Sequence, residues 1–220
     1  MIDNRMVAMK VIAVLVVSLY MNSLFIILVP EVYTSFMTLI PILLLSIVTC
    51  FDVAIRSVST ERDRYNRAIV SLAFLLFPLM VALPYAEFMY LTSTYLIGLM
   101  DYVFIVGVLV LLLGSSILVA SRVQIGQYGG SKIAIEDEHK LITDRMYRYI
   151  RNPQYLGFLL LFSGYSFSFG SIIVMLATAI GLFVVFRSRI LLEEKILLEK
   201  FESEYEEYMN HTWRLLPHVY

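Results

Sequence analysis

Two clusters of polar residues flank the last long apolar stretch of the chain and contain most of the residues that could do chemistry. The first covers residues 139–157 and reads H-K-L-I-T-D-R-M-Y-R-Y-I-R-N-P-Q-Y-L-G; the second covers residues 189–197 and reads R-I-L-L-E-E-K-I-L. Residues 156–186 carry no charge. A pair of helices that leaves the membrane face after the first cluster and returns before the second would bring both clusters to the same face.

Arg151, Asn152 and Pro153 directly precede an apolar helix. Proline suits the first helical turn, where no backbone hydrogen bond is lost, and Asn152 is a possible N-cap. Arg151 would then lie beside free backbone N–H groups at the positive end of the helix, which suits a carboxylate or a phosphate. The alternative is that Arg151 anchors the helix to lipid headgroups.

Glu193, Glu194 and His139 each allow a functional and a structural interpretation. A carboxylate close to the bilayer could hold a cationic ligand, but acidic residues are also common at the start of a helix. His139 could bind a ligand or act as a base, or it could be a solvated loop histidine. No group of His, Cys, Asp and Glu has the spacing of a zinc site, so we expect no metal.

The chain that positions these clusters has the composition of a membrane protein. Of its 220 residues 60% are hydrophobic, and the mean hydropathy is +0.79, whereas a soluble domain is about 45–50% apolar. Four apolar runs of roughly the length that crosses ~30 Å of hydrocarbon lie near residues 7–29, 32–51, 68–91 and 98–120. A retained first helix is expected rather than a cleaved signal peptide, because no small-residue cleavage site follows it.

The fifth apolar run, residues 156–186, is too long for one span. Serines and glycines near its middle predict a tight helix pair that turns near residues 169–170, and the second helix could be too short to cross alone. We therefore predict an all-α, polytopic membrane protein with about five to six transmembrane helices. Residues 1–120 would form about four of them. Residues 121–220 would contain a loop, a helix pair over 153–186 and a cytosolic amphipathic helix over 187–210.

The basic residues predict the orientation. All 17 Lys and Arg lie in segments that share one side if there are six passages, so both termini are expected to be cytoplasmic and the protein multi-pass. Glu87 and Asp101 lie near the opposite surface, where we expect wetted interfacial acids rather than an ion path. The net charge of −1 gives no attraction for nucleic acid.

Read together, the clusters resemble one family. The order H-x-L-x-T-x(3)-Y-x(3)-R-N-P-x-Y-x-G, then an apolar helix pair, then R-x(3)-E-E-x(2)-L-x(3)-F-x(3)-Y-x(2)-Y and R-x-x-P resembles the isoprenylcysteine carboxyl methyltransferases and the related phospholipid-methyltransferase-like proteins. The resemblance covers about residues 136–217. Two positions depart from it: the family usually has glycine where Arg145 and Glu202 stand, and Arg145 could alter the loop around the cofactor.

The resemblance implies a membrane enzyme that uses S-adenosylmethionine at the cytoplasmic face without a Rossmann domain. The acceptor would be lipophilic, a prenylcysteine-like carboxylate or a lipid amine, and would enter from the bilayer among the membrane lipids. Arg189 could position an anionic acceptor, and Glu193 or Glu194 could serve as the base that an amine or thiol needs. Gly157 could serve helix packing or leave space for the cofactor, and the resemblance favours space. The residues that would bind the cofactor are His139, Leu141, Thr143, Tyr147, Arg151, Asn152, Pro153, Tyr155, Gly157 and Glu194.

Two other functions are compatible with parts of the sequence. Membrane sterol and steroid reductases, which use NADPH, share N-P-x-Y-x-G and a closing R-x-x-P; the H-x-L-x-T stretch before R-N-P favours the methyltransferase. A non-enzymatic scaffold or channel would bind neither cofactor. Protection by S-adenosylmethionine, by NADPH or by neither would separate the three.

Overall fold

The computed structural model describes residues 4–28, 30–55, 77–92, 97–126 and 141–217. Within them the chain is helical, and the one β-type contact is an isolated bridge between Ile150 and Trp213, so the predicted all-α class is confirmed. The elements are α1 (Asn4–Leu28), η1 (Pro30–Thr34), α2 (Phe36–Ile55), a helix over 77–87 that continues into the π-helical turn η2 (Phe88–Thr92), η3 (Ile97–Leu99), α5 (Met100–Ile125), η5 (Arg145–Arg148), α6 (Pro153–Ser168) and α7 (Ile172–His211).

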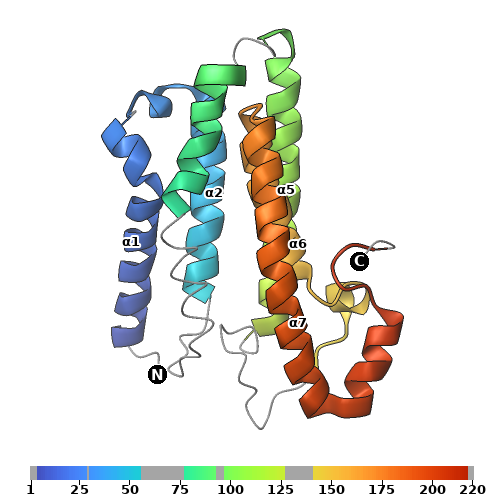
Figure 1. Cartoon of the computed structure of the whole chain (residues 1–220). Helices are drawn as coiled ribbons and strands as arrows, with labels where there is room; N and C mark the ends of the chain where they lie inside the picture. The colour runs from blue at the N-terminus through green and yellow to red at the C-terminus, as the bar shows by residue number, and fades with distance from the viewer. Residues whose placement is uncertain (1–3, 29, 56–76, 93–96, 127–140, 218–220) are drawn as a thin grey trace.

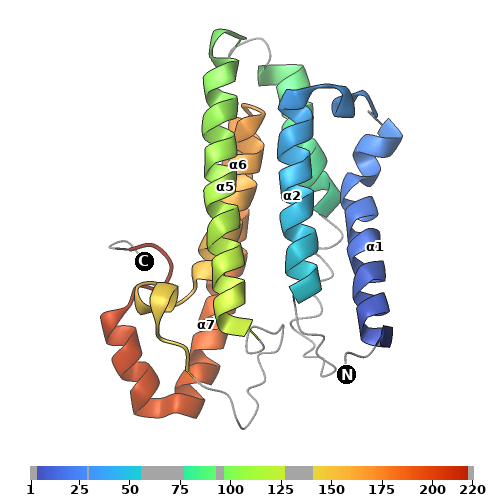
Figure 2. The same ribbon diagram turned by 180° about the vertical axis from the view of Figure 1, so that it is seen from behind.

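The long helices lie side by side in two groups. One group holds α1, α2 and the helix over 77–87, and the other holds α5, α6 and α7 (Figures 1 and 2). The second part of α7 bends away from the bundle and folds back towards residues 141–152, drawn in yellow in Figure 1. The two polar clusters therefore lie at the same end of the second group.

Helices α5 and α6 pack antiparallel with their backbones in close approach. A Cβ placed on Gly114 would lie 2.4 Å from the backbone nitrogen of Leu161, and one on Gly164 would lie 2.4 Å from that of Leu111. No side chain fits at such positions, so glycine allows the two helices to approach closely. Each helix contributes two such glycines spaced seven residues apart: Gly107 and Gly114 in α5, Gly157 and Gly164 in α6.

The turn between the last two helices lies where the sequence predicts it. Helix α6 ends at Ser168, Gly170 has a φ of 71°, and α7 begins at Ile172. The relative lengths of the two helices differ from the expectation: the first helix of the pair, and not the second, is the short one. Helix α6 has 16 residues, a length of about 24 Å, whereas α7 has 40.

Helix α7 also corrects the predicted boundary at residue 187. The helix continues from the apolar segment through Arg187 and Arg189, and its non-helical residue is Glu202, with φ 45° and ψ −119°. Between these positions the chain has no glycine or proline and is rich in Arg, Leu, Glu and Lys, which are good helix formers. The predicted amphipathic helix over 187–210 is therefore continuous with the apolar segment of α7 and is not a separate element.

Two helices in the described part of the chain are long and apolar enough to cross a membrane, α5 and α7. Shorter apolar helical segments are Val11–Ile27, Phe36–Asp52 and Phe77–Leu91. The count of five to six spans stays a prediction.

Two buried acidic residues hold helices together. The Glu87 carboxylate accepts hydrogen bonds from the backbone N–H groups of Ile173 at 3.0 Å and Val174 at 2.7 Å, which places a negative charge at the positive end of α7. The expectation of a wetted interfacial acid is wrong for Glu87, which is buried, whereas Asp101 is exposed. Asp52 of α2 pairs with Arg122 of α5 at 2.6 Å, and both side chains are nearly inaccessible.

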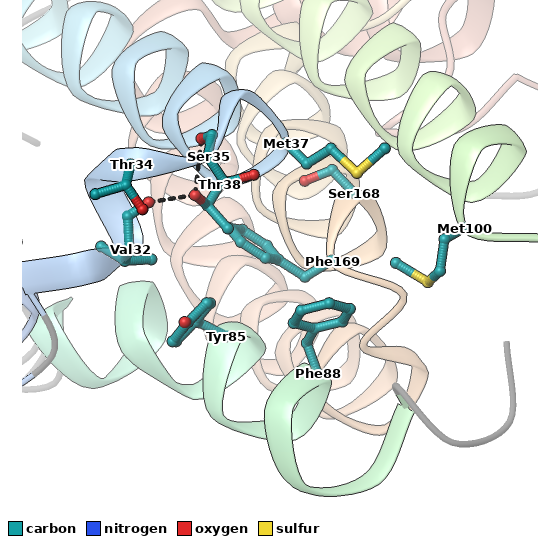
Figure 3. Close-up of a pocket in the computed structure, with 10 residues that line it drawn as sticks. All are labelled: Val32, Thr34, Ser35, Met37, Thr38, Tyr85, Phe88, Met100, Ser168 and Phe169. Carbon is teal, nitrogen blue, oxygen red and sulfur yellow. Dashed lines mark hydrogen bonds between the residues drawn. The ribbon is translucent and has the colours of Figure 1, made fainter. Parts of the chain in front are cut away.

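A cavity of about 300 Å³ lies at the end of the bundle where α6 ends and α5 begins. Figure 3 shows aromatic and methionine side chains around it, with hydroxyl groups at its edge. Thr38 donates to backbone carbonyls of Val32 and Ser35. The polar clusters lie at the opposite end of α6.

Candidate active site

Glu194 joins the two polar clusters through a buried ion-pair network. Its Oε1 accepts a hydrogen bond from Nε of Arg151 at 3.0 Å, and its Oε2 accepts one from Nε of Arg214 at 2.8 Å. The side chains of Arg151 and Glu194 are 8% and 7% exposed. Two guanidinium groups offset the cost of burying a carboxylate. Removing the carboxylate, or removing the guanidinium groups, would leave the opposite charge buried and unpaired. The structure thus pairs Arg151 and Glu194 with each other.

Arg151 also forms hydrogen bonds with the C-terminal segment of the chain. Its Nη1 donates to the carbonyl oxygens of Met209, at 2.9 Å, and of Thr212. Its backbone N–H donates to the carbonyl of Trp213 at 2.8 Å, and the N–H of Trp213 donates to the carbonyl of Tyr149 at 2.9 Å. The segment that carries R-x-x-P is therefore part of the site.

Pro153 lies where the sequence predicts it, whereas the side chain of Asn152 does not cap α6. Pro153 is buried in the first turn of α6, as expected. Asn152 occupies the N-cap position, but its side chain makes no capping bond. Its Nδ2 instead donates to the carbonyl of Arg214 at 3.0 Å, because the C-terminal segment lies directly beside it.

A second cluster forms around Glu193. The Tyr155 hydroxyl donates to Glu193 Oε1 at 2.7 Å, and Nε of Arg189 donates to the same oxygen at 2.8 Å. The ring of Tyr155 lies 4.9 Å from that of Phe186. Arg189 and Glu193 are 20% and 26% exposed, so this cluster is more accessible than the Glu194 network.

Tyr147 fixes the loop before α6 to the second part of α7. Its carbonyl accepts a hydrogen bond from the Tyr208 hydroxyl at 2.6 Å, and its own hydroxyl accepts one from Gln154 Nε2 at 3.2 Å. Burial raises the pKa of Tyr147 to about 12, although the hydrogen bond with Gln154 opposes the shift. The phenol is therefore protonated at physiological pH. Tyr208 is not among the site residues that the sequence predicts, although it is the second tyrosine of the Y-x(2)-Y pattern.

Arg145 and Glu202, which stand where the family usually has glycine, have backbone conformations that glycine adopts more readily. Arg145 has φ 48° and Glu202 has φ 45°, and they are the two non-glycine residues with positive φ in the described part of the chain. A left-handed conformation is costly for any residue with a Cβ. The loop before α6 and the bend in α7 thus have a geometry that suits glycine, although this sequence has Arg145 and Glu202 there.

Gly157 requires a correction. A Cβ on this residue would lie 2.8 Å from the backbone nitrogen of Leu118 in α5. Helix packing therefore explains the glycine, and the preference for cofactor space as its reason is wrong. Leu141 is half-buried and Thr143 is exposed, and His139 lies outside the described residues.

Arg151 and Glu193 each have a terminal atom that makes no hydrogen bond to the described residues. In the described residues, the second terminal nitrogen of Arg151, Nη2, has no protein partner, and neither has Oε2 of Glu193. Both oxygens of Glu194, in contrast, are already paired. No group of three metal-ligating side chains occurs among the residues that the structure describes.

Comparisons with known proteins identify relatives of this arrangement. The family model of the phospholipid methyltransferases matches residues 102–204. A probable protein-S-isoprenylcysteine O-methyltransferase of Oryza sativa subsp. indica is 33% identical over 144 residues, which cover 63% of this chain and 75% of the relative. The protein-S-isoprenylcysteine O-methyltransferase of Schizosaccharomyces pombe is 33% identical over 100 residues, 44% of this chain and 42% of the relative.

A solved structure has the same fold. The eukaryotic intramembrane Ras methyltransferase ICMT, isoprenylcysteine carboxyl methyltransferase, superposes with a TM-score of 0.59 at 18% identity, over 97% of this chain and 77% of that one. The relatives favour a methyltransferase over the NADPH-dependent reductase and the non-enzymatic scaffold. The chain belongs to the family of membrane methyltransferases that includes the isoprenylcysteine O-methyltransferases, and it is an integral membrane methyltransferase.

Proposed function

We propose that the methyl donor is S-adenosylmethionine, that it binds beside Arg151 and Glu193, and that the acceptor is a lipophilic molecule from the bilayer. The observation that carries this proposal is the meeting of the two polar clusters at one end of α6 and α7. There an arginine nitrogen and a carboxylate oxygen have no partner among the described residues.

The charges of these residues fit the cofactor. S-adenosylmethionine carries an amino-acid carboxylate, an ammonium group and a sulfonium, and when bound it supplies an activated methyl group. Nη2 of Arg151 suits the carboxylate, and Oε2 of Glu193 suits a cationic group. Glu194 would act by holding Arg151 in place, since both its oxygens are occupied. The remaining proposed cofactor residues are His139, Leu141, Thr143, Tyr147, Asn152, Pro153 and Tyr155.

The chain's own residues would align the acceptor and exclude water. Methyl transfer depends mainly on alignment of nucleophile, methyl and sulfur. A carboxylate acceptor needs no base, and Arg189 could hold it as an anion. An amine would have to lose a proton, which Glu193 could accept. The isoprenylcysteine O-methyltransferases among the relatives favour a prenylcysteine carboxylate, whereas the matching family model is that of the phospholipid methyltransferases.

We further propose that this end of the bundle faces the cytoplasm, with both termini on that side and several passages through the membrane. The positions of the 17 basic residues support this orientation. A reporter fused after Tyr220 should be active in the cytoplasm. A reporter active only on the outside would refute this orientation.

The experiment that tests the proposed function is incubation of the purified protein with methyl-labelled S-adenosylmethionine and a panel of lipophilic acceptors. A base-labile labelled product would be a carboxyl ester, and a base-stable one a methylated amine. Glu193→Gln should abolish methylation of an amine, whereas methylation of a carboxylate should be slowed by weaker donor binding but not abolished. Glu199→Gln, which removes a carboxylate charge at an exposed position of α7, is the matched control. Absence of label from every acceptor, together with protection by NADPH, would refute the proposal.

A further inference from the structure

Gln124, near the end of α5, makes hydrogen bonds on both sides of Arg145. Its Nε2 donates to the backbone carbonyl of Asp144 at 2.6 Å and to the Asp144 carboxylate at 3.1 Å. Its Oε1 accepts a hydrogen bond from the backbone N–H of Met146 at 3.3 Å. One side-chain amide therefore bonds both peptide groups that flank Arg145.

Those two peptide groups determine the backbone conformation of Arg145. Because peptide groups are planar, the rotations φ and ψ about one Cα describe how the preceding and following planes are oriented. Holding the carbonyl of Asp144 and the N–H of Met146 orients both planes. The φ of Arg145 is 48°, an unfavourable value for a residue with a Cβ. The hydrogen bonds of Gln124 offset that cost.

The conformation at Arg145 determines the path of the chain towards Arg151. Arg145 begins η5, and two residues later the buried Tyr147 is fastened to Tyr208. The bridge between Ile150 and Trp213 follows, and Arg151 then enters the Glu194 network. A change in the direction of the chain at Arg145 would therefore displace the residues that follow it, up to Arg151.

We propose that Gln124 is a positioning residue: it stabilises the left-handed Arg145 and thereby holds residues 144–151 in the conformation that presents Arg151. The consequence for the methyl donor rests on the proposed function. Gln124 lies before the first polar cluster, and no pattern in the sequence points to it. It touches neither Arg151 nor Glu193 in the structure, so it acts through the loop.

The test uses the full-length protein and four variants. Gln124→Met keeps the length of the side chain and removes its hydrogen bonds; Arg145→Gly removes the backbone cost; the third variant combines both changes. Ser116→Ala is the control, because this exposed serine of α5 bonds only within its own helix. Hydrogen exchange of residues 141–151 is measured without donor, and the Kd for S-adenosylmethionine is measured in parallel.

We expect Gln124→Met to speed exchange in this segment and to weaken donor binding about tenfold, because two to three hydrogen bonds are lost. Arg145→Gly should restore slow exchange in the double variant and bring its Kd to within about threefold of that of Arg145→Gly alone. The proposal would be overturned if Gln124→Met left the exchange of this segment unchanged, or if it speeded exchange equally with and without Arg145→Gly. If the wild-type protein bound no donor, the proposed function would fail, and the exchange measurement would still decide the role of Gln124.

Discussion

Replacing Glu202 by glycine should stabilise the protein, although glycine usually weakens a helix. Glu202 is exposed and has φ 45° and ψ −119° at the bend of α7, a region that is essentially restricted to glycine and costs other residues about 1–3 kcal/mol. Glycine would remove this cost but lose about 0.5–1 kcal/mol through the greater freedom of the unfolded chain. The net gain in the free energy of unfolding should be up to roughly 2.5 kcal/mol.

The matched control is Glu204→Gly, two residues further along the same helix. Glu204 is also exposed, but its backbone is helical, so glycine there should cost about 1 kcal/mol. Thermal unfolding of both variants in the same detergent measures the difference, which for a chain of this size should appear as a shift of several degrees between the two Tm values. Equal losses of Tm in the two variants would show that Glu202 has an ordinary helical backbone, and the reasoning would be wrong.

Three further predictions concern the packing and the buried charges. Gly157→Leu should lower the Tm of the unliganded protein sharply, because overpacking costs about 1–3 kcal/mol or more. Gly181→Leu, where a Cβ meets nothing within 4 Å, should raise the Tm slightly, because leucine is the better helix former; equal Tm values in the two variants would contradict the α5–α6 interface. Glu194→Gln should cost about 3–5 kcal/mol by leaving Arg151 without its carboxylate, whereas Glu199→Gln, at an exposed pair, should cost under about 1 kcal/mol; denaturant titration would measure both, and similar values would argue against a buried network. Glu87→Gln should destabilise by about 1 kcal/mol through a weaker cap on α7, with unchanged donor affinity, and a large loss of affinity would place Glu87 in the site.

Much of the architecture follows from periodic or compositional features of the sequence. The turn near Gly170 could be predicted because small residues interrupt a long apolar run, and the meeting of Arg151 with Glu194 follows from a helix pair that returns to one face. The sequence does not indicate the continuity of α7 past Arg187, because a change from apolar to charged residues resembles a boundary, although the helix propensity does not change there.

The remaining features depend on neighbours that the sequence does not place. The role of Gly157 depends on the register between α5 and α6, and apolar periodicity does not determine that register. Glu87 looks like a surface acid until the start of α7 is placed against it. Arg151 looks like an anion site at a helix terminus, and only the folded position of residues 209–214 shows that most of its donors are used within the protein.

The central claim is that the methyl donor binds at the end of the bundle where Arg151 lies. The most direct test is the affinity of the purified protein for S-adenosylmethionine in Arg151→Met and in Arg187→Met, with the Tm of each variant as a check of folding. Loss of a charge-assisted hydrogen bond should weaken binding in Arg151→Met by about 1.5–3 kcal/mol, which is roughly 10- to 150-fold. The affinity of Arg187→Met should equal that of the wild type, because Arg187 is exposed and outside the site. Equal affinity of folded Arg151→Met and wild-type protein would contradict the assigned site.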